Sequence, residues 1–173
     1  MRILLVGVIL IATVALGVAA YMGAFHRVAI TEQDRGPYTL VYREISASEM
    51  SKVGEITTAL DSLLEGAGIV RRKPLDVFFP EGREEVGFAV ESATADQLAI
   101  LKDKAKVTEI PAQRFMVAEF PWRNRASYLV GYIKVDPALA KYRSAHLYKK
   151  VEALALHDGR AIVYMQPVVA SQP

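Results

Sequence analysis

The chain begins with an unbroken run of apolar residues. No charged side chain occurs from Ile3 to Phe25, and the run is almost wholly aliphatic as far as Ala12. A helix needs about 20 apolar residues to cross the hydrocarbon core of a bilayer. The pattern therefore predicts a transmembrane anchor over residues 1–27, with residues 3–25 in contact with the membrane, followed by a folded domain over residues 28–170.

A cleaved signal peptide is the alternative interpretation of this amino-terminal run. Arg2 supplies a short positive region, and Val18-Ala19-Ala20 offers small residues where a signal peptidase would cut. Tyr21 and Phe25 beside Arg27 favour a retained anchor, because aromatic and basic residues gather at the membrane interface. The charge balance across the run favours a single-pass membrane protein whose domain lies outside the cytoplasm.

The first half of the domain shows clear strand and helix patterns. Residues 28–45 are rich in β-forming side chains, with one glycine–proline interruption. Ser46 and Glu49 form a capping box, and apolar residues at helical spacing follow them. Residues 75–79 and 86–90 then alternate as two strands of a hairpin.

The second half repeats this order after a connector at residues 92–106, which holds one helical turn. Residues 114–120 form a strand, and a helix follows that restarts at Asp136-Pro137, with Asp as cap and Pro at the first position. Residues 150–156 and 161–165 flank an Asp-Gly hairpin turn.

These patterns predict an α+β fold. An amino-terminal transmembrane helix precedes a duplicated strand–helix–strand–strand domain, with both helices on one face of an antiparallel sheet.

Charge and composition exclude several classes of function. Removing Arg2 and Arg27 from the 21 basic residues leaves 19, which equals the number of acidic residues. Without a basic patch, binding to nucleic acid has no electrostatic support. The chain has no cysteine, and its three histidines are not at metal-ligand spacing, so no metal site is expected. No phosphate loop, dinucleotide fingerprint or nucleophile elbow is present, and no cofactor is predicted.

Four segments carry a resemblance to a known family. They are Gly36–Tyr42, Ile110–Phe115, Val151–Leu154 and Tyr164–Val168. In this order they resemble the first strand, the opening of the second half, an x-E-I-Y strand and the closing Y-x-P segment of GyrI-like effector-binding domains. That family was first described in a DNA gyrase inhibitor and in multidrug-responsive transcription regulators. With its apolar amino end, the chain resembles the membrane-anchored branch of the family.

The resemblance implies a pocket for small molecules, and it points to Glu152. In the family the glutamate of the x-E-I-Y strand faces the ligand, where desolvation raises its pKa. Spacing alone favours a solvent-facing position for Glu152 on an alternating strand. Trp122, the only tryptophan, lies at a strand-to-helix junction where it either rims the groove or packs. The candidate ligand-binding residues are Glu152, Trp122, Tyr148, Phe120 and Tyr128.

Three functions remain open from the sequence. The first is a non-catalytic, membrane-anchored module that binds a small apolar or cationic molecule or a protein partner. The second is a hydrolase of reactive, cyclopropane-bearing electrophiles, in which Glu152 would act with Tyr148 or Trp122. The third is an interaction scaffold without a pocket.

Overall fold

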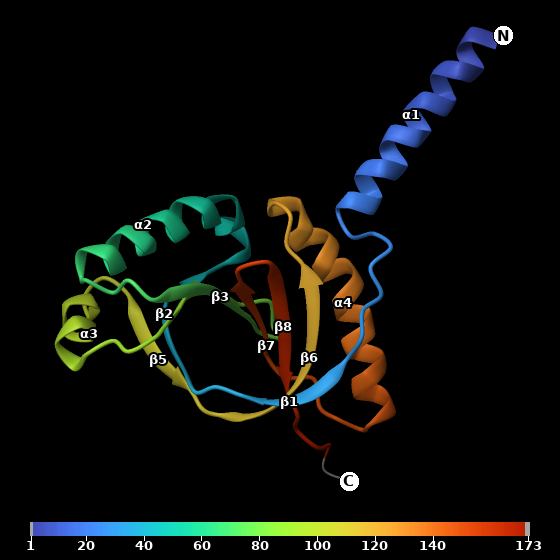
Figure 1. Cartoon of the computed structure of the whole chain (residues 1–173). Coiled ribbons are helices and arrows are strands. Elements are labelled where there is room, and N and C mark those ends of the chain that lie inside the picture. Colours follow the sequence, from blue (N-terminus) through green and yellow to red (C-terminus); the bar gives the residue numbers. More distant parts are fainter. Residues whose placement is uncertain (1, 172–173) are drawn as a thin grey trace.

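An antiparallel sheet of eight strands, curved into a half-barrel, forms the body of the chain (Figure 1). The computed structural model describes residues 2–171. The helices are α1 (Arg2–Tyr21), the short 3-10 helix η1 (Ala47–Lys52), α2 (Val53–Gly66), α3 (Ala95–Leu101) and α4 (Arg125–Ala145). The strands are β1 (Thr31–Arg35), β2 (Tyr38–Ile45), β3 (Arg72–Phe78), β4 (Glu84–Val90), β5 (Lys106–Ile110), β6 (Gln113–Pro121), β7 (Ala153–Asp158) and β8 (Ala161–Pro167).

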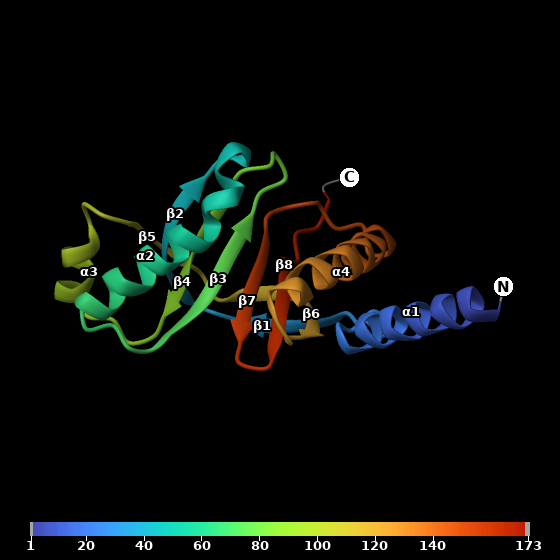
Figure 2. The same ribbon diagram turned by 90° about the horizontal axis from the view of Figure 1, so that it is seen from above.

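The apolar run at the amino end does not form one continuous helix. The helix α1 ends at Tyr21, and a turn follows in which Met22 is only 8% exposed and Gly23 has a φ of +86°. A Cβ atom added to Gly23 would lie 2.8 Å from the ring of Phe120, so this part of the run packs closely on the domain. Figure 2 shows α1 extending away from the sheet beyond that point.

Over residues 2–171, no helix is both long enough and apolar enough to cross a membrane. The predicted transmembrane anchor, its membrane contact through residues 3–25, and the single-pass location with an extracytoplasmic domain are therefore wrong. The helix ends at Tyr21, and the next two residues, Met22 and Gly23, are buried on the domain instead of extending it.

The strand order of the sheet is β1-β6-β8-β7-β3-β4-β2-β5. Strands β2, β4 and β3 form one block, β6, β8 and β7 form another, and β3 pairs with β7 where the blocks meet. The stretch predicted as one strand, residues 28–45, divides at Gly36-Pro37 into β1, which pairs with β6, and β2, which pairs with β4 and β5. The antiparallel register of β1 against β6, with Arg35 opposite Gln113, continues without a shift into that of β2 against β5, with Tyr38 opposite Ile110.

The predicted fold class is thus corrected in two respects. The structure is an α+β half-barrel of eight antiparallel strands with four α-helices in its described part, and none of these helices spans a membrane. The sequence pattern did not separate β1 from β2, and it did not show that β5 is a strand in its own right. Both β1 and β5 are edge strands without a buried residue, so they carry little hydrophobic pattern.

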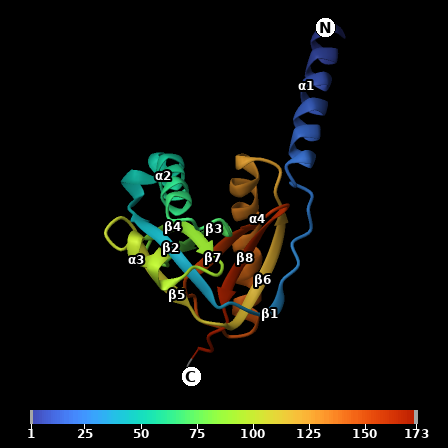
Figure 3. The same cartoon turned by 60° about the vertical axis from the view of Figure 1, so that its left-hand side comes forward.

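The helices α2 and α4 lie on the same side of the sheet (Figures 2 and 3). Leu60 and Leu64 of α2 pack against Val41 and Phe88 of the first block. The helix α4 packs on the second block through another apolar cluster, which includes Val135, Leu139, Phe120 and Ile162. Each helix therefore has its own core.

The opposite side of the sheet is the interior of the half-barrel. Leu40, Leu75, Phe115, Leu154 and Met165 point into it and are fully or almost fully buried. Side chains on one strand alternate between the two sides. The central strands β3 and β7 consequently contribute to the half-barrel interior on one side and face the two helices on the other.

The structure differs from two local predictions. The helix α4 continues through Pro137 instead of restarting there. Pro137 is exposed, and so is Ile133 four residues earlier, so the carbonyl group that loses its helical hydrogen bond faces water. Glu152, predicted within a strand, lies immediately before β7, and the carbonyl of Val151 next to it accepts a hydrogen bond from the Gln166 side chain.

Candidate ligand-binding groove between α2 and α4

The helices α2 and α4 face each other above the sheet (Figure 3). Residues of both helices line a groove of about 320 Å³. Its volume is at the lower end of the range, about 300–1,000 Å³, in which ligand sites are found. The lining residues come from α2, β3, the junction between β6 and α4, and the first turn of α4: Val53, Gly54, Thr57, Thr58, Asp76, Trp122 and Tyr128.

Asp76 is the charged residue among those that line the groove. Leu75 and Val77 point into the half-barrel, so alternation along β3 turns Asp76 toward the helices. The Tyr128 hydroxyl donates a hydrogen bond to Asp76 Oδ2 at 2.9 Å. Tyr164 in turn donates to the backbone carbonyl of Tyr128 at 3.0 Å, which fixes the position of that ring. Hydrogen bonding thus orients the carboxylate beside the Tyr128 ring.

Burial dominates the electrostatics of this carboxylate. One edge of Asp76 reaches the groove, while protein surrounds its other sides and desolvates the charge. Desolvation raises the pKa of Asp76 from 3.8 to about 6, against the opposing effects of the Tyr128 hydroxyl and the Gly87 amide. The same environment raises the pKa of Tyr128 well above its ordinary value, so this phenol stays a hydrogen-bond donor.

A second carboxylate lies close to the first. Glu84 of β4 faces the helical side of the sheet beside Phe78 and is only 8% exposed. Desolvation, and then repulsion by Asp76, raises its pKa to about 7. Among the side chains that the structure describes, no basic one pairs with Asp76 or Glu84. The groove therefore carries a negative charge that none of these described side chains offsets.

Aromatic rings border this charge. Trp122 stands at the groove with its ring 4.4 Å from that of His157, and the Trp122 amide donates to the Arg160 carbonyl at 2.9 Å. Phe78 lies next to Tyr128, with a centroid separation of 6.4 Å. Aromatic faces attract cations, and they supply large apolar contact areas.

The junction that presents Trp122 is held by the amino-terminal cap of α4. Asn124 Oδ1 accepts from the Ala126 amide at 2.9 Å, while the Ser127 hydroxyl accepts from the Arg123 amide at 3.1 Å. Capping interactions of this kind fix where a helix begins. They therefore set the distance between Trp122, just before α4, and Tyr128, one turn inside it.

The structure brings together two of the five residues proposed from the sequence, Trp122 and Tyr128. Phe120 is close to them in the chain but fully buried, with its ring under Gly131 of α4 and under Gly23. It can support the groove only through packing.

The other two residues lie elsewhere. Tyr148 is at the far end of α4, where its hydroxyl donates to Glu32 Oε1 at 2.9 Å. Glu152 is half-buried at a different cavity, which also holds Val77 and Leu154 of the half-barrel interior. The glutamate that the family resemblance assigns to the pocket is thus not at the groove.

Sequence reasoning missed Asp76 and Glu84. A signal for Asp76 was present, because it is the one charged residue in the apolar run from Leu75 to Phe79. Alternation alone does not tell whether such a residue faces water or a covered groove. Glu84 lay in a stretch assigned to a turn, and its burial follows from the extra length of β4.

The described part of the chain contains no group of three or more histidine, cysteine, aspartate or glutamate side chains that could hold a metal ion. The groove therefore has to be understood through its own carboxylates and aromatic rings.

The chain matches no family model and no curated protein. Solved structures, however, share its fold. SAV2435 bound to tetraphenylphosphonium aligns with a TM-score of 0.58 and 15% identity, over 81% of this chain and 93% of that one. The carboxy-terminal domain of EcmrR aligns with a TM-score of 0.61 and 11% identity, over 84% and 98%.

An integron cassette protein from the mobile metagenome of Vibrio cholerae aligns with a TM-score of 0.57 and 6% identity, over 83% of this chain and 99% of that one. At identities this low the similarities establish the fold alone. They are consistent with the GyrI-like effector-binding fold.

Proposed function

We propose that this chain is a GyrI-like effector-binding domain that binds a bulky, apolar organic cation between α2 and α4, without catalysis. The observation that carries the proposal is Asp76, a desolvated carboxylate beside Trp122 and Tyr128 that has no basic partner among the described side chains.

The charge of the groove favours a cationic ligand. With a pKa of about 6, Asp76 is mostly ionised at neutral pH, and an unpaired buried charge is unfavourable. A cation about 4 Å from the carboxylate would gain roughly 4 kcal/mol at an effective dielectric constant of 20. Contact with aromatic faces adds about 0.5–2 kcal/mol.

The walls of the groove favour a large apolar body over a small hydrated ion. Trp122 and Tyr128 present rings, and the hydroxyls of Thr57 and Thr58 are occupied by the backbone carbonyls of Val53 and Gly54. With these donors already used, the groove provides one charge and several apolar surfaces. The printed ligand of one structure with this fold, tetraphenylphosphonium, has that chemistry.

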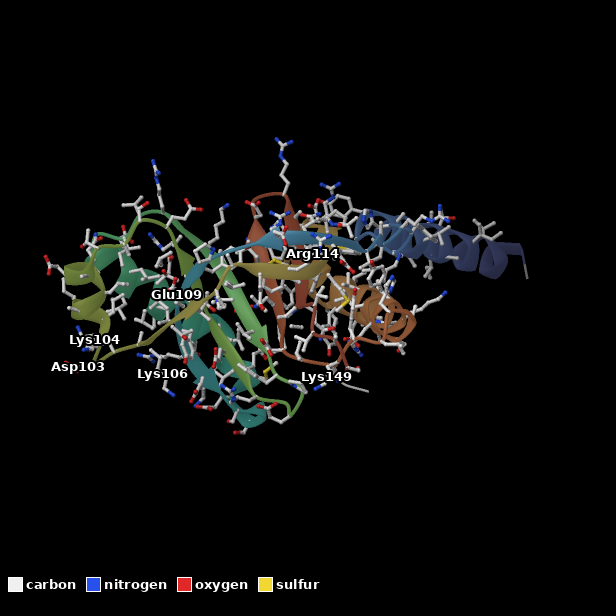
Figure 4. The ribbon with its side chains drawn as sticks, turned by 90° about the horizontal axis from the view of Figure 1, so that it is seen from below. Asp103, Lys104, Lys106, Glu109, Arg114 and Lys149 are labelled. Carbon is white, nitrogen blue, oxygen red and sulfur yellow. The ribbon has the colours of Figure 1, made fainter. Side chains whose placement is uncertain are left out.

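Calorimetric titration with tetraphenylphosphonium tests the proposal. We expect saturable binding that Asp76→Asn weakens at least tenfold, because the substitution removes the charge while keeping the side-chain volume. The neutral analogue triphenylphosphine oxide should bind much more weakly than the cation. Asp103→Asn, on the exposed surface near α3, is the matched control and should bind as the wild type does (Figure 4). Equal affinity for the two ligands, or no effect of Asp76→Asn, would contradict the proposal.

No observation favours the hydrolase alternative. That reaction requires Glu152 to act together with Tyr148 or Trp122. Trp122 lines the groove, Tyr148 bonds to Glu32, and Glu152 lines the other cavity.

A further inference from the structure

Glu84, the first residue of β4, is a buried carboxylate beside the groove whose own contacts do not account for its burial. It is only 8% exposed. Among the side chains and backbone amides that the structure describes, none donates a hydrogen bond to this carboxyl or forms an ion pair with it. Glu85, the next residue, differs because it accepts a hydrogen bond from Arg83 at 2.6 Å. Burial of a polar group is unfavourable without a partner, so Glu84 is a candidate for contact with a ligand.

The register of the sheet places Glu84 and Asp76 on the same side. Val86 lies opposite Asp76, and Glu84 lies opposite Phe78, which packs toward α4. Because residues two apart on a strand face the same way, Glu84 and Val86 both point to the side of Asp76. The two acids are therefore diagonal neighbours across β3 and β4, a relation that holds residues roughly 7–8 Å apart. Charge on either acid raises the pKa of Tyr128, so both act on the groove.

Aromatic rings connect the two carboxylates. Phe78 lies two residues after Asp76 on β3 and directly opposite Glu84. Its ring centroid is 6.4 Å from that of Tyr128 and 6.3 Å from that of Tyr132. Tyr132 lies one turn further along α4 and is 47% exposed, so the aromatic surface continues from the groove to solvent. A flat cation on this surface would have a carboxylate near each end.

This arrangement does not suit a metal ion. A calcium or magnesium ion requires several oxygen ligands within about 2.6 Å. The described residues offer no group of three or more acidic, histidine or cysteine side chains that could supply them. A monocation beside Asp76, in turn, would leave Glu84 without a partner. Two acids joined by aromatic rings match two positive charges held apart by an apolar body.

We propose that the groove prefers a rigid aromatic dication, with one charge beside Asp76, the other toward Glu84, and its rings against Phe78 and Tyr128. The inference rests on the proposed function, since it concerns the same groove, and it names the class of organic cation. A 4,4′-bipyridinium ion has this chemistry, because it holds one positive nitrogen at each end of two linked rings. Its charges are thus separated on the same scale as the two acids.

Two ions of nearly the same shape test the proposal. They are the dication 1,1′-dimethyl-4,4′-bipyridinium and the monocation 1-methyl-4-phenylpyridinium. Calorimetric titration of the full chain uses pH 8 and about 0.15 M salt, where charges more than about 8 Å away are largely screened. We expect the dication to bind the wild type at least tenfold more tightly, although the net charge of the chain, +2, gives no general attraction for it. Equal affinities would overturn the proposal without the need for a variant.

The variant Glu84→Gln assigns the preference to this carboxylate. It keeps the side-chain volume and removes a buried charge, so it should fold at pH 8. We expect the dication to lose its advantage over the monocation almost completely. Glu109→Gln, which changes an exposed glutamate on β5, is the matched control and should keep the full preference (Figure 4). A preference that survives Glu84→Gln, or that falls equally in both variants, would overturn the proposal.

The failure of this inference is distinguishable from failure of the proposed function. If tetraphenylphosphonium and the pyridinium monocation bind and the dication has no advantage, only the preference for a dication is overturned. If none of the three cations binds saturably, the proposed function is overturned together with it.

Discussion

The buried position of Asp76 lowers the free energy of unfolding at neutral and higher pH. Its carboxyl has a pKa of about 6 in the folded chain, against 3.8 for an ordinary aspartate. Because the folded-state pKa is the higher of the two, the native state binds more protons than the unfolded state between these values. The contribution of Asp76 is therefore favourable at about pH 4 and is lost as the pH rises through 6. Perturbed carboxyls of this kind are concentrated at functional sites.

This linkage predicts that Asp76→Asn is more stable than the wild type at pH 8. A shift of about two pKa units corresponds to roughly 3 kcal/mol, since each unit is about 1.4 kcal/mol. The asparagine side chain would lose the hydrogen bond from the Gly87 backbone amide. We therefore expect a net gain of about 1–2 kcal/mol in the free energy of unfolding. Urea unfolding of both proteins at pH 8 and at pH 4 measures this difference in the free energy of unfolding. A gain of the same size at both pH values would contradict the assigned cause.

At the residue scale, composition and pattern predicted part of the groove. Trp122 and Tyr128 were predicted as ligand contacts, and both lie at the groove, although no ligand contact has been tested. Asp76 could not be predicted, because its environment depends on the pairing of β3 with β7 and on the helices above. These contacts join parts of the chain more than 50 residues apart, such as Asp76 and Tyr128.

At the scale of elements, α4 depends on a close approach to the sheet at Gly131. A Cβ atom added there would lie 2.6 Å from the Tyr164 hydroxyl and 3.0 Å from the Phe120 ring. That approach lets Tyr164 bond to the Tyr128 carbonyl. The position of Tyr128 at the groove thus rests on a glycine one turn further along the helix.

We accordingly predict that Gly131→Ala destabilises the fold by about 1–3 kcal/mol, the usual range for overpacking. Alanine is the better helix former, so intrinsic propensity predicts the opposite sign. Gly66→Ala in α2 is the matched control, because nothing lies within 4 Å of a Cβ atom there. Thermal unfolding should show a lower Tm for the first variant and an unchanged or higher Tm for the second.

The segment after α1 is attached to α4 by Lys134. Its ammonium group donates to the backbone carbonyls of Gly23, Ala24 and His26. We predict that Lys134→Met increases amide hydrogen exchange over residues 22–27 at least tenfold while leaving β3 and β7 unchanged. If exchange in this segment stays the same, packing of Met22 and Gly23 alone holds it.

The prediction of helices and strands from the sequence depended on how much of each segment is buried. Strong periodicity located the helices that bury a face, and a capping box marked the start of the helical segment at Ser46. The exposed edge strand β5 carried no pattern, and the run from Ile3 to Phe25 gave no sign that its last residues turn back onto Phe120. Apolar residues alone do not distinguish a continuing helix from a turn that packs on a domain.

At the scale of the whole molecule, the structure has two separate acidic environments. One side carries the groove with its desolvated Asp76, and the mouth of the half-barrel carries three carboxylates. The chain's overall charge of +2 conceals both. Pairing between distant strands creates these environments, and composition could not have predicted them.

The pKa of Asp76 also predicts how cation binding depends on pH. Only the ionised carboxylate attracts the ligand, so affinity for tetraphenylphosphonium should be about tenfold lower at pH 5 than at pH 8. Glu84, with a pKa of about 7, loses its charge at a higher pH than Asp76, so the affinity begins to fall earlier as the pH is lowered. Protonation of His157 behind Trp122 also lowers the affinity for a cation. Asp76→Asn retains both groups, so the pH dependence that remains in this variant measures their share. A wild-type affinity that is constant from pH 8 to pH 5 would contradict the role of Asp76.

Trp122 is the only tryptophan and lines the groove, so its fluorescence reports directly on the central claim. Titration of the full chain with tetraphenylphosphonium at pH 8 should change the emission saturably, and Asp76→Asn should shift the midpoint at least tenfold to higher concentration. An emission that does not change, or a midpoint that is the same in both proteins, would show that the groove is not a cation site.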